Sequence, residues 1–284
     1  MNTEALLYLI PTPLGNLGDF SVRAADIVKN LRHIACEDTR ISAPFLKAFN
    51  ADLQLFCAFE HVENRAASKI IAFLEQGESV GLVTDAGTPA VSDPGAKIVQ
   101  MVRAAGFKIV ALPGACAAIT AFSMSGFLST QFFFCGFLPP KKAARQKVLK
   151  DLKNQNAAII FYESPHRIFE SLNDFGEIFQ NRSLFIAREL TKRFEESALL
   201  KAKEAAAWIL AKPQRQKGEF VLILDACEAS TQFEALEAER VLKILLDGNL
   251  SLKESANLAA KITGFAKNEL YKKALDLKKS TVNE

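Results

Sequence analysis

Two corners made of small residues follow two predicted strands near the middle of the chain. Residues 85–89 (DAGTP) follow the apolar run 80–84, and residues 113–118 (PGACAA) follow the apolar run 107–112. Small side chains let a ligand approach the backbone closely, and ligands of open α/β sheets bind at the carboxyl ends of the strands. The two corners therefore predict one wall of a small-molecule site. The helix after the first corner is expected to begin at Pro94 with Asp93 as its cap.

The loop after the first predicted strand does not have the pattern of a phosphate-binding loop. Residues 11–19 read PTPLGNLGD and follow the apolar run 6–10. They contain neither the GxGxxG spacing nor a Gly-Lys-Ser/Thr ending, which are the patterns that cradle nucleotide phosphates. This departure argues against a nucleotide-phosphate site.

Charged corners follow other predicted strands. The segments are residues 37–40 (EDTR), 163–167 (ESPHR) and 188–192 (RELTK). Acids and cations directly after a strand allow proton transfer or phosphate binding, and the alternative is a helix cap with a surface ion pair. Metal chemistry has little support, because the three histidines (His33, His61 and His166) are far apart in the sequence. Cys116 stands without an assignable base, so we expect it to pack rather than react.

The elements that must hold these corners alternate between strand and helix. This order predicts a mostly parallel sheet with helices on both faces over residues 1–137. Two prolines and a basic run then mark a boundary, and residues 138–226 form a second α/β domain with partly antiparallel strands. Residues 233–280 resemble a three-helix, helix-turn-helix-like module, whose second helix Ser251 is expected to cap.

Composition sets limits on the class of protein. The chain has 284 residues, of which 49% are hydrophobic and 24% charged, as in globular proteins. The sequence shows no signal peptide and no apolar run long enough to span a membrane. Its five cysteines are scattered, which favours a reducing, cytoplasmic location. Because the net charge is only +3, a polyanionic partner would have to meet a local basic patch.

Seven of these motifs, in this order, resemble the tetrapyrrole-methylase superfamily. The motifs are PTPLGNLGD, CEDTR, TDAGTPAVSDPG, LPGACAA, FYESPHR, ARELTK and KGEFVL, and they cover residues 7–224. They are most similar to its ribosomal branch, the 16S rRNA (cytidine-2'-O)-methyltransferases, and the tail is similar to that branch's C-terminal extension. Cys116 stands where members often have serine, and Pro11 and Pro13 stand where many relatives have glycine.

The resemblance implies two α/β domains with S-adenosylmethionine in the cleft between them and no metal. It implies that the methyl acceptor is the ribose 2'-hydroxyl of a cytidine in the decoding region of 16S rRNA, within the small subunit. It also implies a homodimer. By motif, the implied cofactor contacts are Leu14, Asp85, Thr88, Cys116, Ala117, Tyr162, Ala187 and Glu219.

Methyl transfer needs positioning and a group that accepts the hydroxyl proton. Glu37, Asp38, Glu163, His166 and Glu189 are candidates for this base, and Glu189 and Glu37 are favoured among them. The alternative is that these acids only lock their loops through Arg–carboxylate bonds. The cations expected to contact RNA phosphates are Arg40, Arg167, Arg188, Lys192, Lys141, Lys142 and Arg145.

Two other functions are compatible with parts of the sequence. A precorrin-type small-molecule methyltransferase would share the two small-residue corners but would not need the charged corners or the basic run. A non-catalytic RNA-binding or ribosome-assembly protein would not need the two corners as a ligand pocket. Binding of S-adenosylmethionine and the identity of the methylated product distinguish the three.

Overall fold

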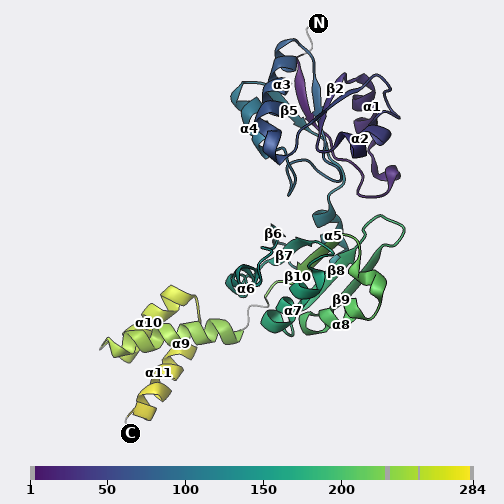
Figure 1. Cartoon of the computed structure of the whole chain (residues 1–284). Coiled ribbons are helices and arrows are strands. Elements are labelled where there is room, and N and C mark those ends of the chain that lie inside the picture. The colour runs from purple at the N-terminus through teal and green to yellow at the C-terminus, as the bar shows by residue number, and fades with distance from the viewer. Residues whose placement is uncertain (1–3, 228–230, 249, 282–284) are drawn as a thin grey trace. The chain divides into compact units, whose positions relative to one another are not determined.

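The structure is a computed structural model that describes residues 4–227, 231–248 and 250–281. It divides into two compact units, Met1–Ala226 and Cys227–Glu284. The larger unit contains two five-stranded sheets, and the smaller one contains three helices (Figure 1). Among the described residues, no helix is both long and apolar enough to cross a membrane.

The first sheet is parallel, in agreement with the prediction of a mostly parallel sheet, but its last strand ends at residue 111. The final strand of the predicted range 1–137, Phe132–Phe137, belongs to the second sheet. Its strand order is β3-β2-β4-β1-β5. The strands are β1 (Leu6–Leu9), β2 (His33–Cys36), β3 (Gln54–Cys57), β4 (Val80–Leu82) and β5 (Lys108–Ala111). Their short apolar runs suit a sheet that is covered on both faces.

Two pairs of helices supply that cover. The helices are α1 (Val22–Asn30), α2 (Thr39–Leu46), α3 (Glu63–Glu75) and α4 (Ala96–Ala104). Helices α1 and α2 share one apolar cluster with the sheet, and α3 and α4 share another. Ser21 caps α1 by accepting a hydrogen bond from the Ala24 N–H. All four helices connect strands whose carboxyl ends lie at one edge of the sheet, and that edge carries the predicted corners.

The start of α4 differs from the prediction. Asp93 does not cap the helix; Gly95 is the N-cap residue, with φ of +131°, and its N–H donates to Oε1 of Glu63 at 2.6 Å. Glycine adopts such a φ without steric cost. The preceding loop also holds Ala90 and Ser92 at positive φ. The chain therefore makes a longer turn than the sequence indicated, and the Asp93 side chain does not bind the start of α4.

The second sheet is mixed, with the order β6-β7-β10-β8-β9. Strands β6 and β7 are parallel, and the other pairs are antiparallel. The strands are β6 (Phe132–Phe137), β7 (Ala158–Glu163), β8 (Ser183–Arg188), β9 (Glu196–Lys201) and β10 (Phe220–Leu224).

Helices cover both faces of this sheet as well. Helix α5 (Ala117–Ser125) packs on one face through Ala118 and Ala121. The other face is covered by α6 (Lys142–Asp151), α7 (Ile168–Phe179) and α8 (Ala205–Leu210). Helix α5 directly follows the second small-residue corner, so one turn links that corner to the second sheet.

The basic helix α6 has a buried face, which its run of positive charges did not indicate. Arg145 is only 3% exposed, and its Nε lies 2.6 Å from Oδ2 of the buried Asp174 in α7. Gln146 donates to the other oxygen of Asp174 at 2.8 Å. The prediction that Arg145 contacts RNA is therefore wrong, because its guanidinium is used to join α6 to α7. Lys141 and Lys142 are exposed.

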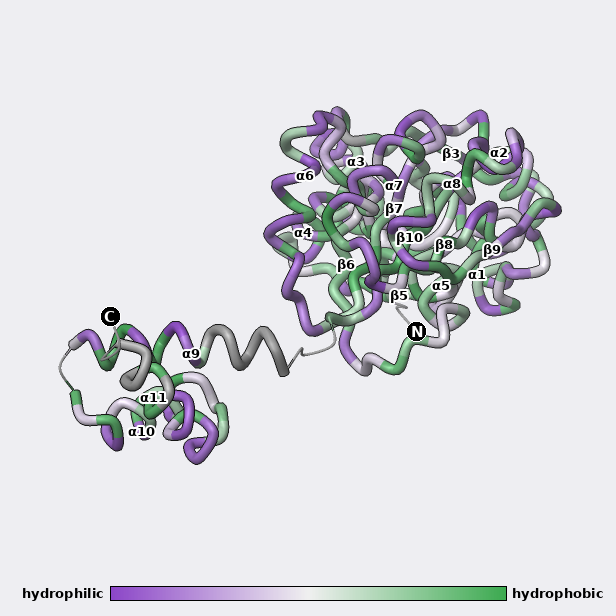
Figure 2. The backbone as a smooth tube through the Cα atoms, turned by 90° about the horizontal axis from the view of Figure 1, so that it is seen from below, coloured by the Kyte–Doolittle hydropathy of each residue, from purple (hydrophilic) through white to green (hydrophobic). Residues whose placement is uncertain are grey.

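The smaller unit is a three-helix module, as predicted. Its helices are α9 (Thr231–Asp247), α10 (Leu252–Thr263) and α11 (Lys267–Thr281). Figure 2 shows hydrophilic and hydrophobic stretches alternating along α10 and α11. A small apolar core joins the three helices, and Glu239 of α9 pairs with Lys273 of α11 at 2.8 Å. Between the predicted domains 138–226 and 233–280, residues 228–230 lie outside the described residues, and Thr231 already belongs to α9.

Ser251→Ala is expected to destabilise the start of α10 by about 1 kcal/mol. Ser251 and Glu254 form a capping box, which confirms the predicted cap, and alanine removes its side-chain acceptor. Hydrogen exchange should show protection of the Glu254 amide falling about fivefold. Ser255→Ala is the matched control, because the buried Ser255 hydroxyl has no hydrogen-bond partner among the described residues. Equal protection in the parent and in Ser251→Ala would contradict the prediction.

Candidate active site

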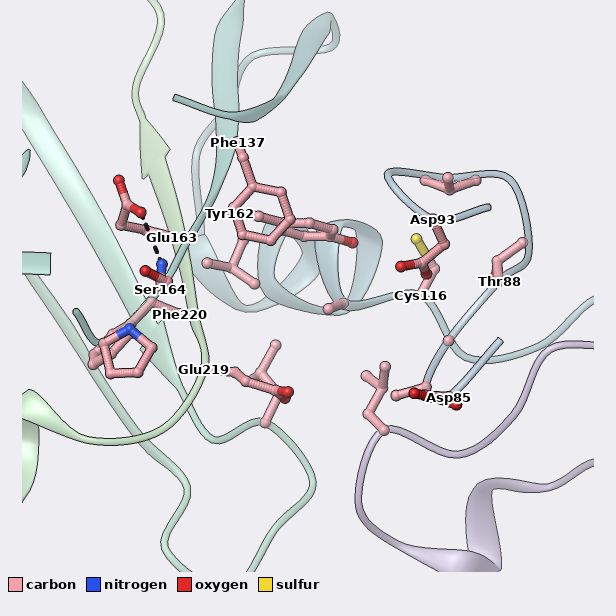
Figure 3. Close-up of a pocket in the computed structure, with 18 of the residues that line it drawn as sticks. Asp85, Thr88, Asp93, Cys116, Phe137, Tyr162, Glu163, Ser164, Glu219 and Phe220 are labelled. Carbon is pink, nitrogen blue, oxygen red and sulfur yellow. Dashed lines mark hydrogen bonds between the residues drawn. The ribbon is translucent and has the colours of Figure 1, made fainter. Parts of the chain in front are cut away.

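A cavity of about 450 Å³ lies between the carboxyl edge of the first sheet and the second sheet. This volume is within the range of small-molecule sites. Figure 3 shows Asp85, Thr88 and Cys116 on one side of it and Glu163 and Phe220 on the other. Its lining residues are Leu14, Glu37, residues 85–88, Val91, Asp93, Cys116, Ala117, Phe137, residues 162–165, Leu190 and residues 219–221.

The two small-residue corners are tied to each other and to the loop after β1. Thr12 and Gly87 exchange two backbone hydrogen bonds of 2.9 and 3.0 Å. The Thr88 hydroxyl donates to the carbonyl of Ala115 at 2.8 Å. Gly87 has φ of +86°, a conformation that residues with a Cβ rarely adopt. These bonds hold the backbone of this wall in place before a ligand arrives.

An aromatic wall faces the corners from the second sheet. The Tyr162 hydroxyl accepts a hydrogen bond from the Ala118 N–H at 3.1 Å, near the start of α5. The rings of Phe134 and Phe137 meet the Tyr162 ring edge-on, with centroids 5.0 and 5.6 Å away. Burial raises the pKa of Tyr162 well above its usual value, so the phenol is neutral. Tyr162 thus joins the second sheet to the corner that carries Cys116.

Three carboxyl groups line the cavity on the side of the first sheet. They belong to Glu37, Asp85 and Asp93. Burial, and then the charge of Asp85, raises the pKa of Glu37. Burial likewise raises the pKa of Asp85, whose Oδ1 accepts a hydrogen bond from the Asp38 N–H at 3.2 Å. Burial, and then the charge of Glu37, raises the pKa of Asp93 to about 6. This wall therefore holds groups that accept protons more readily than free carboxylates do.

Asp93→Asn is expected to stabilise the protein at pH 7 to 8 relative to the parent, by about 1–2 kcal/mol. The pKa of Asp93 rises from 3.8 when unfolded to about 6 when folded, so the folded state binds more protons between these values. The parent therefore loses stability as pH rises from 4 to 6, and asparagine removes that loss.

Urea unfolding of both proteins at pH 4 and pH 7.5 measures this effect. The variant should gain stability over the parent between the two values. A stability difference that does not change with pH would show that Asp93 has an ordinary pKa in the folded state.

Glu163 holds the charged corner after β7 from within the core. Its carboxylate accepts hydrogen bonds from the Ser164 N–H at 2.8 Å and from the Ser171 hydroxyl at 2.6 Å. Arg167 pairs with it at 2.9 Å and also donates to the carbonyl of Leu138 at 3.0 Å. Arg167 thus holds this corner in place through an Arg–carboxylate bond. This is the structural role that the sequence left open for Glu163 as the alternative to proton transfer.

Lys192 links two glutamates at the rim of the cavity. Its Nζ lies 2.9 Å from Oε1 of Glu189 and 2.8 Å from Oε2 of Glu219. Partial burial would raise the pKa of Glu189, but the hydrogen bonds from Lys192 and the Glu219 N–H outweigh it and lower that pKa. A Cβ on Gly15 would collide with Cγ of Lys192, so the lysine stem packs against the loop after β1. Glu219 lines the cavity, whereas Glu189 and Lys192 do not.

Comparison with known proteins assigns the chain to a family. The profile of the tetrapyrrole (corrin/porphyrin) methylases matches residues 6–207. The chain belongs to this family. The RsmI C-terminal HTH domain profile matches residues 233–278 of the smaller unit.

Curated relatives place the chain on one branch of the tetrapyrrole methylases. It is 41% identical over 276 residues to ribosomal RNA small subunit methyltransferase I of Escherichia coli O157:H7, covering 97% of this chain and 96% of that protein. It is 44% identical to the protein of the same name from Vibrio cholerae, with coverage of 97% and 96%. The motif resemblance found in the sequence is thereby confirmed, as far as the family and this branch are concerned.

Solved structures support the methylase fold. The methyltransferase CobJ is similar with a TM-score of 0.61 and 18% identity, covering 79% of this chain and 95% of its own. Uroporphyrin-III C-methyltransferase from Thermus thermophilus is similar with a TM-score of 0.57 and 17% identity, covering 78% and 94%. Two α/β domains of the methylase type with an added helical module are therefore the architecture of this chain.

Most of the side chains that the resemblance selected line the cavity of this tetrapyrrole methylase. Ala187 differs, because it is fully buried in the cluster under α5 and does not line it. Sequence reasoning missed Asp93, Phe137, Val91 and Leu190. The position of Phe137 at the end of β6, beside Tyr162 in register, was a usable signal.

The cations predicted to bind RNA divide into exposed and internal groups. Arg188 is 7% exposed, and it donates to the carbonyls of Lys217 at 2.6 Å and Phe194 at 3.1 Å. Its predicted RNA contact is wrong for the same reason as that of Arg145. Arg40 is exposed and pairs with Asp38 at 2.6 Å, which lowers the pKa of Asp38 to about 2. Among the described residues, no three His, Cys, Asp or Glu side chains are arranged to hold a metal ion.

Proposed function

We propose that this chain transfers a methyl group from S-adenosylmethionine to the ribose 2'-hydroxyl of a cytidine in the decoding region of 16S rRNA. The observation that carries the proposal is the match, over 97% of the chain, to relatives named ribosomal RNA small subunit methyltransferase I. The cavity supports it, because its walls carry the small-residue corners of the methylase family and three carboxyl groups. We place the protein in the cytoplasm with its substrate.

The cavity residues fit this cofactor. The two small-residue corners would let an adenosyl group approach the backbone closely at Gly87 and Ala117. The rings of Tyr162 and Phe137 offer flat apolar surfaces for contact with it. The carboxylate of Glu219, held by Lys192, is placed to meet polar groups of the ligand. When bound, S-adenosylmethionine supplies an electrophilic methyl group on a sulfonium. Positioning then accounts for much of the rate, and no metal is required.

Glu37 is the proton acceptor in this proposal. It follows β2, lines the cavity, and has a pKa that burial raises toward the working pH. The pKa of Glu189 is lowered instead, because its Oε1 accepts hydrogen bonds from both Lys192 and the Glu219 N–H. We therefore assign Glu189 the positioning of Lys192 and Glu219, and leave proton transfer to Glu37.

The RNA substrate meets exposed cations around the cavity and on α6. Arg40 lies three residues after Glu37, and Lys141 and Lys142 are exposed at the start of α6. Phosphate contacts of this kind position an RNA without reading its sequence. A 2'-hydroxyl inside folded RNA is hard to reach, so the substrate is the assembled small subunit with this nucleotide splayed out.

A homodimer is supported by an exposed apolar surface on the second sheet, which we call the β6 surface. Strand β6 is an edge strand, and Phe132 and Phe133 are each about half exposed on it. Leu128, in the loop before β6, is 95% exposed. Edge strands and exposed apolar side chains are typical of sites that a partner covers. Sedimentation of the parent and of Leu128→Lys tests this: a parent dimer that the variant weakens supports it.

Two measurements test the proposed reaction. Calorimetry with S-adenosylmethionine should show binding, whereas its absence would favour a non-catalytic RNA-binding protein. Ribose methylation of small-subunit rRNA should be lost at one cytidine in cells that lack the protein. Methyl incorporation into porphyrinoids instead of rRNA would favour the precorrin-type reaction, and methylation of naked rRNA as readily as of subunits would refute the assembled substrate.

A further inference from the structure

The turn between β8 and β9 presents two exposed side chains at the rim of the candidate active site. The Glu195 N–H donates to the carbonyl of Lys192 at 3.1 Å, and this bond closes the turn. Arg193 and Phe194 occupy the two central positions of the turn, and both are exposed. Phe194 is 66% exposed, so packing in the core does not account for this aromatic side chain. We call Arg193, Phe194 and the exposed Lys217 the rim platform.

A buried arginine holds the two parts of the rim platform together. Arg188 donates from Nε to the carbonyl of Lys217 at 2.6 Å and from Nη1 to that of Phe194 at 3.1 Å. One guanidinium group thus makes these two residues neighbours, although they lie far apart in the sequence. At the base of the turn, the Thr191 N–H donates to Oε2 of Glu195 at 2.5 Å. A surface that is held in this way loses little conformational freedom when a ligand binds to it.

The rim platform adjoins the large cavity of the candidate active site. Leu190 lines that cavity and precedes the turn, and Glu219, labelled in Figure 3, lines it and follows Lys217 closely in the sequence. Lys192 joins the two segments at this point, because its Nζ lies 2.8 Å from Oε2 of Glu219. A polymer that places one of its units in the large cavity is therefore able to contact the platform with a neighbouring unit.

The side chains of the rim platform fit an unpaired nucleotide. The Arg193 guanidinium lies over the Phe194 ring, 5.5 Å from its centroid, so a cation and a flat apolar surface occur together. In the part of the chain that the structure describes, neither Arg193 nor Lys217 forms an ion pair with an acid. Bases of single-stranded RNA stack on aromatic side chains and on arginine, and the phosphates meet cations. An apolar protein surface fits less well, because it would bury both charges without a partner.

We propose that the rim platform binds an unpaired nucleotide next to the one that is methylated, with its base stacked on Phe194. Arg193 and Lys217 contact the phosphates on either side of that base. This inference rests on the proposed function, because it needs an rRNA acceptor at the large cavity. Stacking of this kind has little preference among the bases, so the platform anchors the strand and does not read its sequence.

Methyl transfer to small ribosomal subunits tests the stacking. The subunits come from cells that lack the protein, and tritiated S-adenosylmethionine reports the transfer. Phe194→Ala is expected to raise KM for subunits about tenfold and to change kcat less than twofold, whereas Phe194→Tyr should keep the parent KM. Phe194→Leu, which is apolar but has no flat ring, should behave like the alanine variant. Leu199→Ala is the matched control, because Leu199 is an apolar residue, 58% exposed, on β9 of the same sheet.

Salt dependence and crosslinking identify what the rim platform binds. For subunit binding, Lys217→Gln should reduce the slope of the logarithm of the association constant against that of the salt concentration by about one, because one phosphate contact is lost. Photoreactive benzoylphenylalanine in place of Phe194 should crosslink to rRNA within a few nucleotides of the methylated position. A crosslink to a ribosomal protein instead would overturn the assignment of this surface to RNA.

The outcomes separate this inference from the proposed function. If Phe194→Ala keeps the parent KM, the rim platform is refuted while methylation of rRNA stands. The affinity of Phe194→Ala for S-adenosylmethionine should stay within twofold of the parent, because Phe194 does not line the large cavity. A larger loss would show that Phe194 supports the cofactor site, and it would overturn the platform. A parent that binds no S-adenosylmethionine, or that leaves subunits unmethylated, would instead refute the proposed function itself.

Discussion

Glu37→Gln is expected to slow methyl transfer to small ribosomal subunits about 10²- to 10⁴-fold, the range of a general base. The glutamine keeps the size of the side chain but cannot accept the hydroxyl proton. Glu37 lines the large cavity, and its pKa is raised by burial and then by the charge of Asp85. The affinity for S-adenosylmethionine should change less than about threefold, because binding the cofactor does not need this proton transfer.

The pH dependence of the parent rate supplies an independent readout. A base works only when ionised, so the rate should fall as pH drops through the raised pKa of Glu37, which lies above its usual 4.5. Single-turnover rates over pH 5 to 8, for parent and variant, measure both effects. The variant should lose this pH-dependent limb along with its activity.

Asp38→Asn is the matched control for Glu37→Gln. Asp38 is the next residue along the chain, it does not line the cavity, and it caps α2 by accepting from the Arg40 N–H. Asparagine is an equally good cap, so the transfer rate should stay within about threefold of the parent. Equal rates for Glu37→Gln and the parent would remove Glu37 as the base and direct attention to Asp85 and Asp93.

The alternation of strands and helices could be predicted from local patterns, whereas the order of the strands within each sheet could not. Short apolar runs followed by turn residues indicated the parallel strands, and Ser251 marked the start of α10. The attachment of α5 could not be predicted in this way. That helix is apolar on most sides, from Ala118 and Ala121 to the half-exposed Ile119, so its pattern does not say which sheet it covers. Only the tertiary structure shows that it packs on the second one.

The residues of the cavity could be predicted where the position of the backbone alone places them in its wall. They were harder to predict where the course of a loop decides whether a side chain reaches the cavity. Small residues at Gly87 and Ala117 mark a wall in any α/β sheet. Asp93 reaches the cavity because Ala90 and Ser92 take positive φ, and the sequence indicates neither. Asp93 was predicted to cap the helix because it precedes Pro94. The pattern of cap residues does not indicate the longer turn that Gly95 permits.

Arg145 shows the same limit for charge. In the sequence it belongs to a run of lysines, and it lies four residues before Leu149, which is also buried. That spacing puts both residues on one face of α6, as in an amphipathic helix. The prediction followed the run of positive charges instead of this spacing. An arginine reaches the core only if a partner compensates for the lost hydration, and Asp174 is too distant in sequence to be recognised as that partner.

Asp174→Ala is therefore expected to destabilise the fold around the second sheet by about 3–5 kcal/mol. The variant leaves the guanidinium of Arg145 buried at 3% exposure, with the Pro140 carbonyl at 3.3 Å as a remaining acceptor. Such a charge can regain hydration only by opening the contact between α6 and α7. Urea unfolding followed by the fluorescence of Trp208, the single tryptophan of the chain, measures the loss, because Trp208 packs against the same apolar cluster.

Two controls distinguish the buried charge from the simple loss of an ion pair. Asp151→Ala removes an exposed pair with Lys147 on the same helix, 3.5 Å long, and should cost less than about 1 kcal/mol. The double variant Arg145→Met, Asp174→Leu removes both buried charges and should recover most of the lost stability, because apolar residues of similar size often replace a buried pair without loss. If the double variant is as unstable as Asp174→Ala, the pair itself stabilises the fold, and the uncompensated charge is not the cause. If Asp174→Ala costs no more than Asp151→Ala, α6 can release Arg145 to solvent, where the guanidinium would again be available to RNA.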